Sequence, residues 1–199
     1  MSKAESASHK KEKDKKSPAR WALTIFLVTL VISAAISLIS EEIMAMSGTV
    51  VAFVILLVIV LVGIVFDIIG VAVTSADEKP FHSMAARKVP GAKQCILLLR
   101  NAERVSSLCN DVVGDICGVV SGSASATIAA QILANFTFSW PRVITLITSS
   151  LVAGLTVGGK AVGKTFAIRS STKIVHTVGK VICFFSNLPG RFVKKKTKR

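Results

Sequence analysis

Val50 to Thr74 reads VVAFVILLVIVLVGIVFDIIGVAVT, an apolar stretch in which Asp67 is the only charged residue. As an α-helix rising about 1.5 Å per residue, this stretch would be about 37 Å long, which exceeds the roughly 30 Å hydrocarbon core of a bilayer. The stretch therefore predicts a membrane-spanning helix over residues 50–75, and it decides the fold class of the chain.

Three further apolar stretches lie at residues 21–40, 105–133 and 142–158. Of the 199 residues, 51% are apolar and 18% are charged, a balance that excludes a disordered chain and is typical of membrane proteins. We therefore expect an all-α, polytopic integral membrane protein with four transmembrane helices and cytoplasmic interfacial helices. For residues 21–40 the alternative is a cleaved signal peptide, but the stretch is longer than the roughly 7–15 apolar residues usual there, which favours a retained helix.

The charges of the chain lie mainly on one side of the predicted spans. The net charge is +14, and 24 of the 25 Lys and Arg residues fall in 1–20, 76–104 and 160–199, whereas the other two loops carry Glu41, Glu42 and no Lys. Because basic loops stay in the cytoplasm, we expect both termini to be cytoplasmic and the protein to lie in the plasma membrane.

The chain divides into regions by composition, and the basic runs favour contact with anionic lipids over nucleic acid because an apolar helix follows the arm at once. Solvated charge that only sets the topology is the simpler alternative. The expected regions are a disordered basic cytoplasmic arm at 1–20, an extra N-terminal transmembrane helix with its outer loop at 21–48, a membrane domain at 49–185 containing a cytoplasmic belt at 76–104 and an interfacial helix at about 165–185, and a polybasic tail at 186–199 with lipid-binding Lys194, Lys195, Lys196, Lys198 and Arg199.

Three acidic residues fall inside the predicted spans. Asp67, Asp111 and Asp115 would each cost about 2.5–3.5 kcal/mol at membrane depth, so each needs a reason to be there. Counted from the cytoplasmic ends of their helices, the three lie at overlapping depths of roughly 9–15 Å, and we expect them to converge in the inner half of the membrane. The alternatives are protonated acids, a proton relay, and ion pairs with Arg104, Lys160 or Lys164.

Small residues share helix faces with these acids. Gly63, Asp67, Gly70 and Thr74 form one stripe at helical spacing, while Asn110, Gly114, Cys117 and Ser121 form a stripe adjacent to that of Asp111 and Asp115. Glycines spaced by four allow helices to approach closely, which predicts that the acids face protein and permits a homodimer. The predicted packing glycines are Gly63, Gly70, Gly114, Gly118, Gly122, Gly154 and Gly158.

The donor set indicates a hard cation. Carboxylate, amide and hydroxyl oxygens suit Mg²⁺, which is usually held by one or two carboxylates and keeps several of its waters. The predicted ligands are Asp67, Asn110, Asp111 and Asp115, with Thr74 and Ser75 as outer partners.

From Val50 to Val181 the sequence resembles the transmembrane domain of the cyclin M (CNNM) proteins and the bacterial CorB/CorC-type magnesium and cobalt transporters. FDIIGVAVTS at Phe66–Ser75 is similar to the family's FFSASEVALFS, LLLRNAER at Leu97–Arg104 to its belt, LCNDVV at Leu108–Val113 to its LIGNTLVN, and GKAVGKTFAIR at Gly159–Arg169 to its GEVLPKSLAAR.

The resemblance implies a dimer that carries Mg²⁺ near the midplane with a Ser, a Glu and an Asn. By position, Asp67 replaces that Ser, Gly70 replaces the Glu, Asn110 is kept, and Asp111 and Asp115 are extra. The family's nucleotide-binding CBS pair and C-terminal domain have no counterpart among these residues, and a separate regulatory protein is one partner that could supply them.

No enzyme is expected. Gly158 to Thr165 matches the P-loop string GxxxxGK[ST], but an apolar span precedes it where a strand is required. No Ser, His and Asp or Cys and His set falls on one side of the membrane. The sequence therefore predicts transport or sensing of Mg²⁺, with Co²⁺ as a second candidate, and the alternative is a non-transporting scaffold or regulator that binds anionic lipids or a partner protein.

Overall fold

The computed structural model describes residues 18–135 and 140–194, and this part of the chain is helical throughout, without a strand. Helices α6, η1 and α7 follow one another without a break and form one long helix, Ala102–Asn135. The bounds are α2 Pro18–Met46, α3 Thr49–Ser75, α4 Lys79–Ala86, α5 Ala92–Arg100, α6 Ala102–Ser107, the π-helix η1 Leu108–Val113, α7 Gly114–Asn135, α8 Pro141–Arg169 and α9 Ser171–Lys194.

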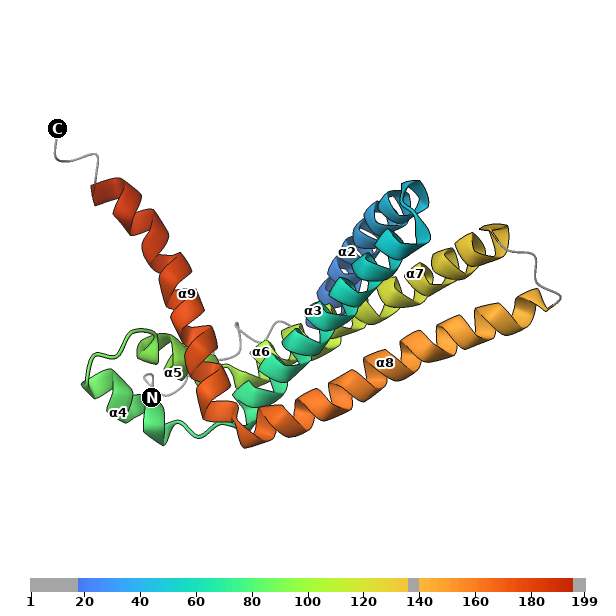
Figure 1. Ribbon diagram of the computed structural model, residues 1–199. Coiled ribbons are helices and arrows are strands. Elements are labelled where there is room, and N and C mark those ends of the chain that lie inside the picture. Colours follow the sequence, from blue (N-terminus) through green and yellow to red (C-terminus); the bar gives the residue numbers. More distant parts are fainter. Residues whose placement is uncertain (1–17, 136–139, 195–199) are drawn as a thin grey trace, which may run out of the picture.

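Within the described residues, four helices are long and apolar enough to cross a membrane, as the sequence predicts. They are Leu23–Met46 of α2, α3, the long helix Ala102–Asn135, and α8. These helices lie side by side, and the connections from α2 to α3 and from α7 to α8 are at the same end of the bundle (Figure 1). The ends of α3 and α8 that lead to α4 and α9 are at the opposite end, which we call the basic end (Figure 1).

Several helix boundaries differ from the sequence expectation. Helix α2 continues through Glu41 and Glu42, which were expected in the outer loop, to Met46, and α9 ends at Lys194 instead of near residue 185. The fourth span was expected to end at residue 158, but α8 continues about three turns further, to Arg169. The interfacial helix consequently begins at Ser171 instead of near residue 165. The reason is packing: buried Gly163 and Ala167 continue the contact of α8 with α3 beyond the apolar stretch.

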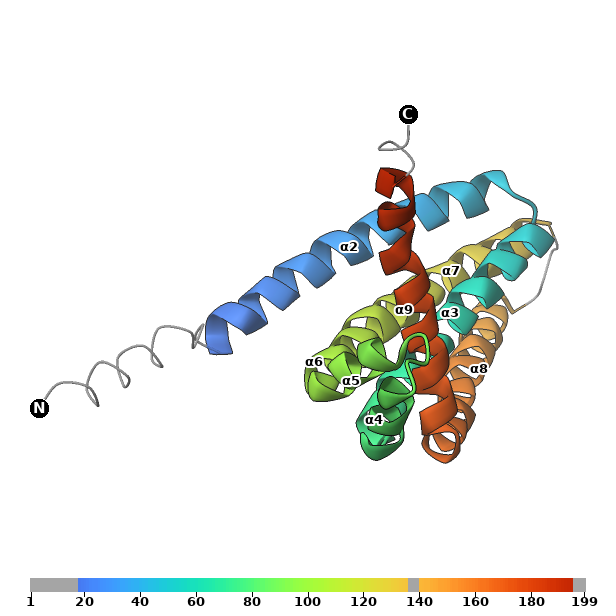
Figure 2. The same ribbon diagram turned by 90° about the vertical axis from the view of Figure 1, so that its left-hand side faces the viewer.

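At the basic end, the predicted belt folds into α4 and α5 and leads into α6, and α9 runs across the end of the bundle (Figures 1 and 2). Helix α5 crosses α9 closely because glycines meet at the crossing. A Cβ on Gly91 would lie 2.7 Å from the backbone nitrogen of Lys180, and the positive φ of Gly91, 86°, also favours glycine.

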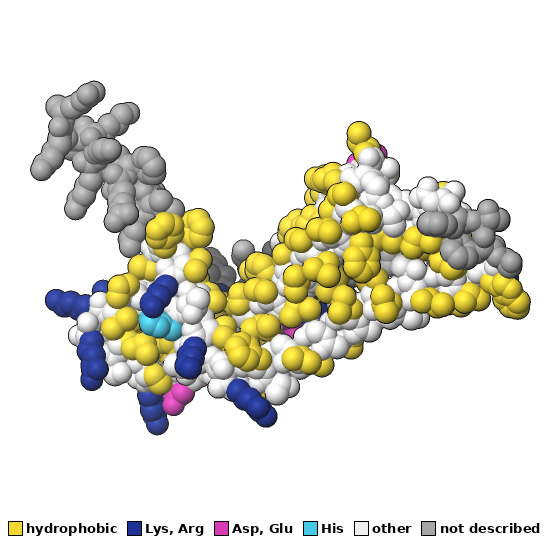
Figure 3. All heavy atoms as spheres, in the orientation of Figure 1, with side chains coloured by type: hydrophobic (Ala, Val, Ile, Leu, Met, Phe, Trp, Pro, Cys, Tyr) yellow, Lys and Arg dark blue, Asp and Glu magenta, His cyan; other side chains and the backbone are white. Residues whose placement is uncertain are grey.

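The surface separates apolar and basic side chains. Apolar side chains cover the long helices, whereas Lys and Arg side chains gather around α4, α5 and α9 (Figure 3). Exposed Leu, Val, Ile and Phe side chains follow α2, α3 and α8 along most of their length. In water this surface would be very unfavourable, so it indicates a lipid-facing belt.

Apolar contacts inside the bundle form three clusters, one at each end and one in the middle. At the basic end, α3, α4, α5, α8 and α9 meet around Phe81, Cys95 and Val175, and in the middle Ile116 and Val120 pack between α2 and α3. The third cluster, at the end that carries the two short connections, contains Met44, Ala52, Leu56, Ala124, Ile128 and Val152.

The expected arm and tail fall mostly outside the described residues. Helix α2 begins at Pro18, within the region expected to be a disordered arm, and residues 1–17 lie outside the description. Lys194 is the last residue of α9, and Lys195, Lys196, Lys198 and Arg199 lie outside the described residues.

Candidate functional site

Asp67 lies on the buried face of α3. The face changes character along the helix, from Leu56 and Val60 to Gly63, Asp67 and Gly70, all of them buried. Asp67 is 4% exposed, and it is about 12 Å from the end of α3 at Ser75. The sequence prediction that Asp67 faces protein is therefore confirmed.

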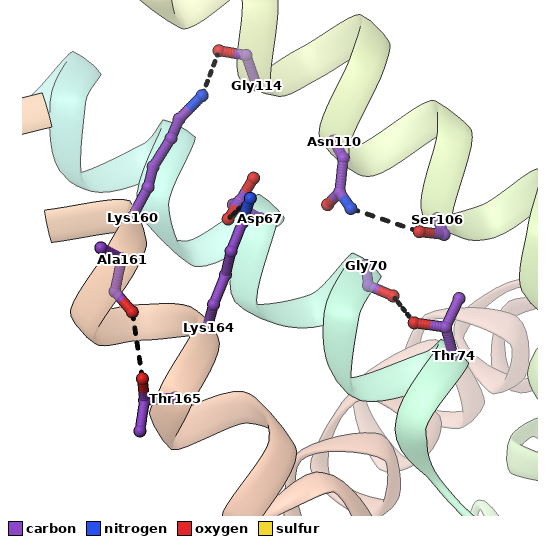
Figure 4. A network of polar contacts seen from close by, with 10 residues as sticks. All are labelled: Asp67, Gly70, Thr74, Ser106, Asn110, Gly114, Lys160, Ala161, Lys164 and Thr165. Carbon is purple, nitrogen blue, oxygen red and sulfur yellow. Dashed lines mark hydrogen bonds and ion pairs between the residues drawn. The ribbon is translucent and has the colours of Figure 1, made fainter. Parts of the chain in front are cut away.

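Two lysines of α8 lie near Asp67: Lys164 extends toward Asp67 of α3, whereas Lys160 extends toward Gly114 of α7 (Figure 4). The Nζ atom of Lys164 lies 3.9 Å from Oδ2 of Asp67, and the side chain of Lys164 is 53% exposed. Lys160 donates to the carbonyl oxygen of Gly114 at 3.2 Å. Oδ2 of Asp67 is buried and accepts no hydrogen bond, so the carboxylate is balanced only by a long, half-exposed ion pair.

Asn110 reaches the same part of α3 from η1. Its Nδ2 donates to Oγ of Ser106 at 3.2 Å, which fixes the amide so that Oδ1 faces Gly70 (Figure 4). A Cβ on Gly70 would clash with Oδ1 of Asn110. Because Gly70 follows Asp67 by about one turn, the amide oxygen and the carboxylate approach the same segment of α3. Oδ1 of Asn110 is also buried and accepts no hydrogen bond.

The expected convergence of three carboxylates is wrong. Asp111 and Asp115 are exposed, in contrast to buried Asp67, and Asp111 accepts a hydrogen bond from Oγ of Ser107 at 2.8 Å. Within residues 18–135 and 140–194, no three His, Cys, Asp or Glu side chains are grouped so that they could hold a metal ion.

The reason lies in which stripe of the long helix faces the bundle. The adjacent stripe of Asn110, Gly114, Cys117 and Ser121 faces inward, and Cβ of Cys117 would be 2.9 Å from a Cβ on Gly63. Both stripes are rich in small residues, and α2 packs on this helix as well as α3 and α8. Periodicity therefore identified both stripes of this helix correctly, but it could not tell that the stripe of Asp111 and Asp115 faces away from the bundle.

The two expected outer partners do not join Asp67. Thr74 is exposed, and its hydroxyl donates to the carbonyl oxygens of Gly70 and Val71 on its own helix. Ser75 is the exposed last residue of α3.

The predicted packing glycines divide into two groups. Gly63, Gly70 and Gly114 contact neighbouring side chains, as expected. A Cβ on any of Gly118, Gly122, Gly154 and Gly158 would meet nothing within 4 Å, so these four do not bring helices together in the described part of the chain. Instead, Gly159 and Gly163 bring α8 against Ile64 and Ile68 of α3.

Sequence reasoning missed four other residues. Ser106 orients Asn110, and its position one helical turn earlier was the available signal. Gly159 and Gly163 repeat the spacing of four seen in Gly154 and Gly158, so they could have been found by the same rule. Gln131 donates to the carbonyl oxygens of Met44 and Ser47 and ties α7 to the end of α2, a long-range contact that no local pattern reveals.

The site offers one carboxylate oxygen and one amide oxygen that accept no hydrogen bond. A dry cage of protein ligands would need more donors, whereas Mg²⁺ is commonly held by one or two carboxylates with several waters retained. These two oxygens are of the kind that Mg²⁺ accepts, and the positive charge of Lys164 beside Asp67 opposes a bound cation.

Comparison of the chain with protein-family models, curated proteins and solved structures found no match.

Proposed function

We propose that the chain is a four-span protein of the plasma membrane, with cytoplasmic termini, that passes or senses Mg²⁺, with Co²⁺ as a second candidate. One observation carries the proposal: Oδ2 of Asp67 and Oδ1 of Asn110 are buried, accept no hydrogen bond, and belong to two helices that meet at Gly70. Buried oxygens that accept no hydrogen bond are costly, and a hydrated cation would satisfy both.

The orientation follows from charge. The Lys and Arg side chains gather at the basic end, and cytoplasmic loops carry the excess of such residues. Asp67 would then lie in the inner half of the membrane, reached from the cytoplasm.

Lys164 supplies a positive charge beside Asp67 that a bound cation can replace. A carboxylate buried without a positive partner would be strongly destabilised, so an ionised Asp67 needs a cation beside it. When Mg²⁺ is absent, the ammonium of Lys164 is the positive partner of Asp67. The exposed, flexible side chain of Lys164 lets the ammonium move away when the ion binds. Lys160 stays on the carbonyl oxygen of Gly114.

The resemblance to the cyclin M and CorB/CorC transporters supports the same function. Asn110 keeps the family's amide, and the carboxylate lies at Asp67 in place of position 70. The shift has a physical reason, because any side chain at position 70 would collide with Asn110. The homodimer and the separate regulatory protein remain predictions. Gly118, Gly122, Gly154 and Gly158, where a Cβ would meet none of the described residues within 4 Å, leave room for a second copy.

The test is ion flux in proteoliposomes containing the full chain and a Mg²⁺-sensitive dye. We expect the Asp67→Asn variant to lose at least about tenfold in flux of Mg²⁺ and Co²⁺, since even outer partners of a metal site cost 10–100-fold when removed. Asp115→Asn is the matched control, because it removes an exposed carboxylate of the neighbouring helix. Unchanged flux in Asp67→Asn would contradict the proposal.

A scaffold or regulator that binds anionic lipids or a partner protein is the second candidate. It is favoured by the ion pair between Lys164 and Asp67, which gives the carboxylate a structural partner without any metal. Thermal unfolding separates the two functions. At 100 times its Kd, Mg²⁺ stabilises a binder by about 2.7 kcal/mol, whereas a scaffold unfolds at the same temperature with or without the ion.

A further inference from the structure

An apolar groove lies between the bundle and α9, on a different face of α3 from that of Asp67. Its volume is about 670 Å³, within the roughly 300–1,000 Å³ of small-molecule sites. The apolar walls come from three helices and include Val65, Ile68 and Ile69 of α3, Phe166 of α8, and Ile174 and Val178 of α9.

The polar part of the groove is basic. Val181 and Ile182 of α9 add to the apolar walls, and the polar lining residues are Ser170, Lys173 and Thr177. The side chain of Lys173 is exposed, and so is Arg169, which ends α8 beside Ser170. No acidic residue occurs anywhere from residue 160 to 199, so nothing on α9 neutralises these charges. The groove thus combines apolar walls with an exposed lysine at its edge.

The position of the groove matches the level of lipid headgroups. It lies where α8, long enough to span, ends and where α9 turns across the end of the bundle (Figures 1 and 3). In a bilayer, the walls on α3 would face acyl chains while Lys173 would lie at the surface. Lysines at this level attract anionic lipids, each by about 1 kcal/mol.

We propose that this groove binds one anionic phospholipid of the inner leaflet, with an acyl chain between α3 and α9 and its phosphate on Lys173. The charge complementarity selects this occupant over a neutral lipid or a second protein chain. The proposal requires insertion of the bundle in a membrane, but it does not depend on Mg²⁺ binding.

The test is native mass spectrometry of the full chain in detergent, titrated with phosphatidylglycerol or phosphatidylcholine of identical acyl chains. We expect one phosphatidylglycerol per chain to bind about fivefold or more tightly than phosphatidylcholine, the effect of one lysine near a headgroup. Lys173→Glu should remove this preference. Lys180→Glu, an equal charge change on an exposed residue of α9 outside the groove, should keep it.

A second variant tests the contribution of the apolar walls separately from that of the lysine charge. Val65 is half exposed, so Val65→Trp can fill the groove without disturbing the core, and it should weaken binding of both lipids. Equal affinity for the two lipids, equal effects of Lys173→Glu and Lys180→Glu, or tight binding that survives Val65→Trp would each overturn the proposal. So would a dimer that binds no lipid, since the groove would then hold a second chain.

Discussion

The two halves of the bundle are held together by different chemistry. Toward the end with the two short connections, Met44, Leu56, Ile128 and Val152 close the space between four helices with apolar contacts. Toward the basic end, the same face of α3 carries Asp67, surrounded by Asn110 and two lysines (Figure 4). The change occurs along one helix face, after Val60.

Asp67 therefore lies in a polar layer between two apolar clusters. One is the cluster of Met44 and Leu56, and the other is the cluster of Phe81, Cys95 and Val175 at the basic end. Tightly packed apolar side chains exclude a hydrated ion, whereas buried oxygens without hydrogen bonds attract one. For a transporter, both clusters are barriers; for a sensor, they are the structural support of the site.

The largest expected effect comes from opening the apolar half. Leu56→Ala removes a side chain that is 2% exposed, and it should lower the free energy of unfolding by about 2–5 kcal/mol while the Mg²⁺ affinity stays unchanged. Leu57→Ala, on the exposed side of α3, is the control and should cost much less. Denaturant unfolding in detergent measures both; a loss of Mg²⁺ affinity in Leu56→Ala would show that the two halves are not separate.

The next effect comes from crowding the polar half. Gly70→Ala places a methyl group against Asn110 and should cost about 1–3 kcal/mol through overpacking, with weaker Mg²⁺ binding. Gly118→Ala meets nothing within 4 Å and should change stability by less than about 1 kcal/mol. Thermal unfolding with and without Mg²⁺ reports both values, and equal results for the two variants would refute the contact between Gly70 and Asn110.

Removing the competing ammonium should have a smaller effect of opposite sign. Lys164→Gln should tighten Mg²⁺ binding by up to about fivefold, because a half-exposed ion pair is worth about 0.2–1 kcal/mol. Lys173→Gln, on α9, removes the same charge away from Asp67 and serves as the control. Equilibrium titration gives the affinities; weaker binding in Lys164→Gln would mean that the lysine assists the ion.

The smallest effect concerns the dry junction of α5 and α9. Burial raises the pKa of the Cys95 thiol, whose Sγ donates to the carbonyl oxygen of Val175 at 3.3 Å. Because the folded-state pKa lies above the unfolded one, this contribution to stability is complete below the unfolded pKa and is lost as the pH rises through the folded pKa. Wild-type stability should fall more steeply at alkaline pH than that of Cys95→Ala, and parallel pH profiles would disprove it.

Sequence patterns predicted the parts of this architecture that depend on one helix at a time. Hydropathy found four long apolar helices, and spacing found the buried face with Gly63, Asp67 and Gly70. Orientation between helices was not predictable in the same way. Asp111 and Asp115 share a face, but only contacts with neighbouring helices decide that the stripe with Asn110 and Cys117 turns inward.

The end of α8 shows a second feature that the sequence could not predict, namely where the helix stops. Lys160 and Lys164 interrupt the apolar stretch, so hydropathy ends the span near residue 158. In the structure both lysines extend toward polar atoms of neighbouring helices while Gly163 packs on α3. A charged residue on a helix is excluded from a membrane only when it lacks such a partner, and partners on other helices are invisible to a window of local sequence.

Calorimetric titration of the full chain with Mg²⁺ tests the central claim most directly. We predict one ion per chain, with affinity reduced at least about tenfold by Asp67→Asn and also by Asn110→Leu, and preserved in Asp111→Asn. Binding that is unaffected by Asp67→Asn and Asn110→Leu, or that is lost in Asp111→Asn alone, would contradict a cation site formed by α3 and η1.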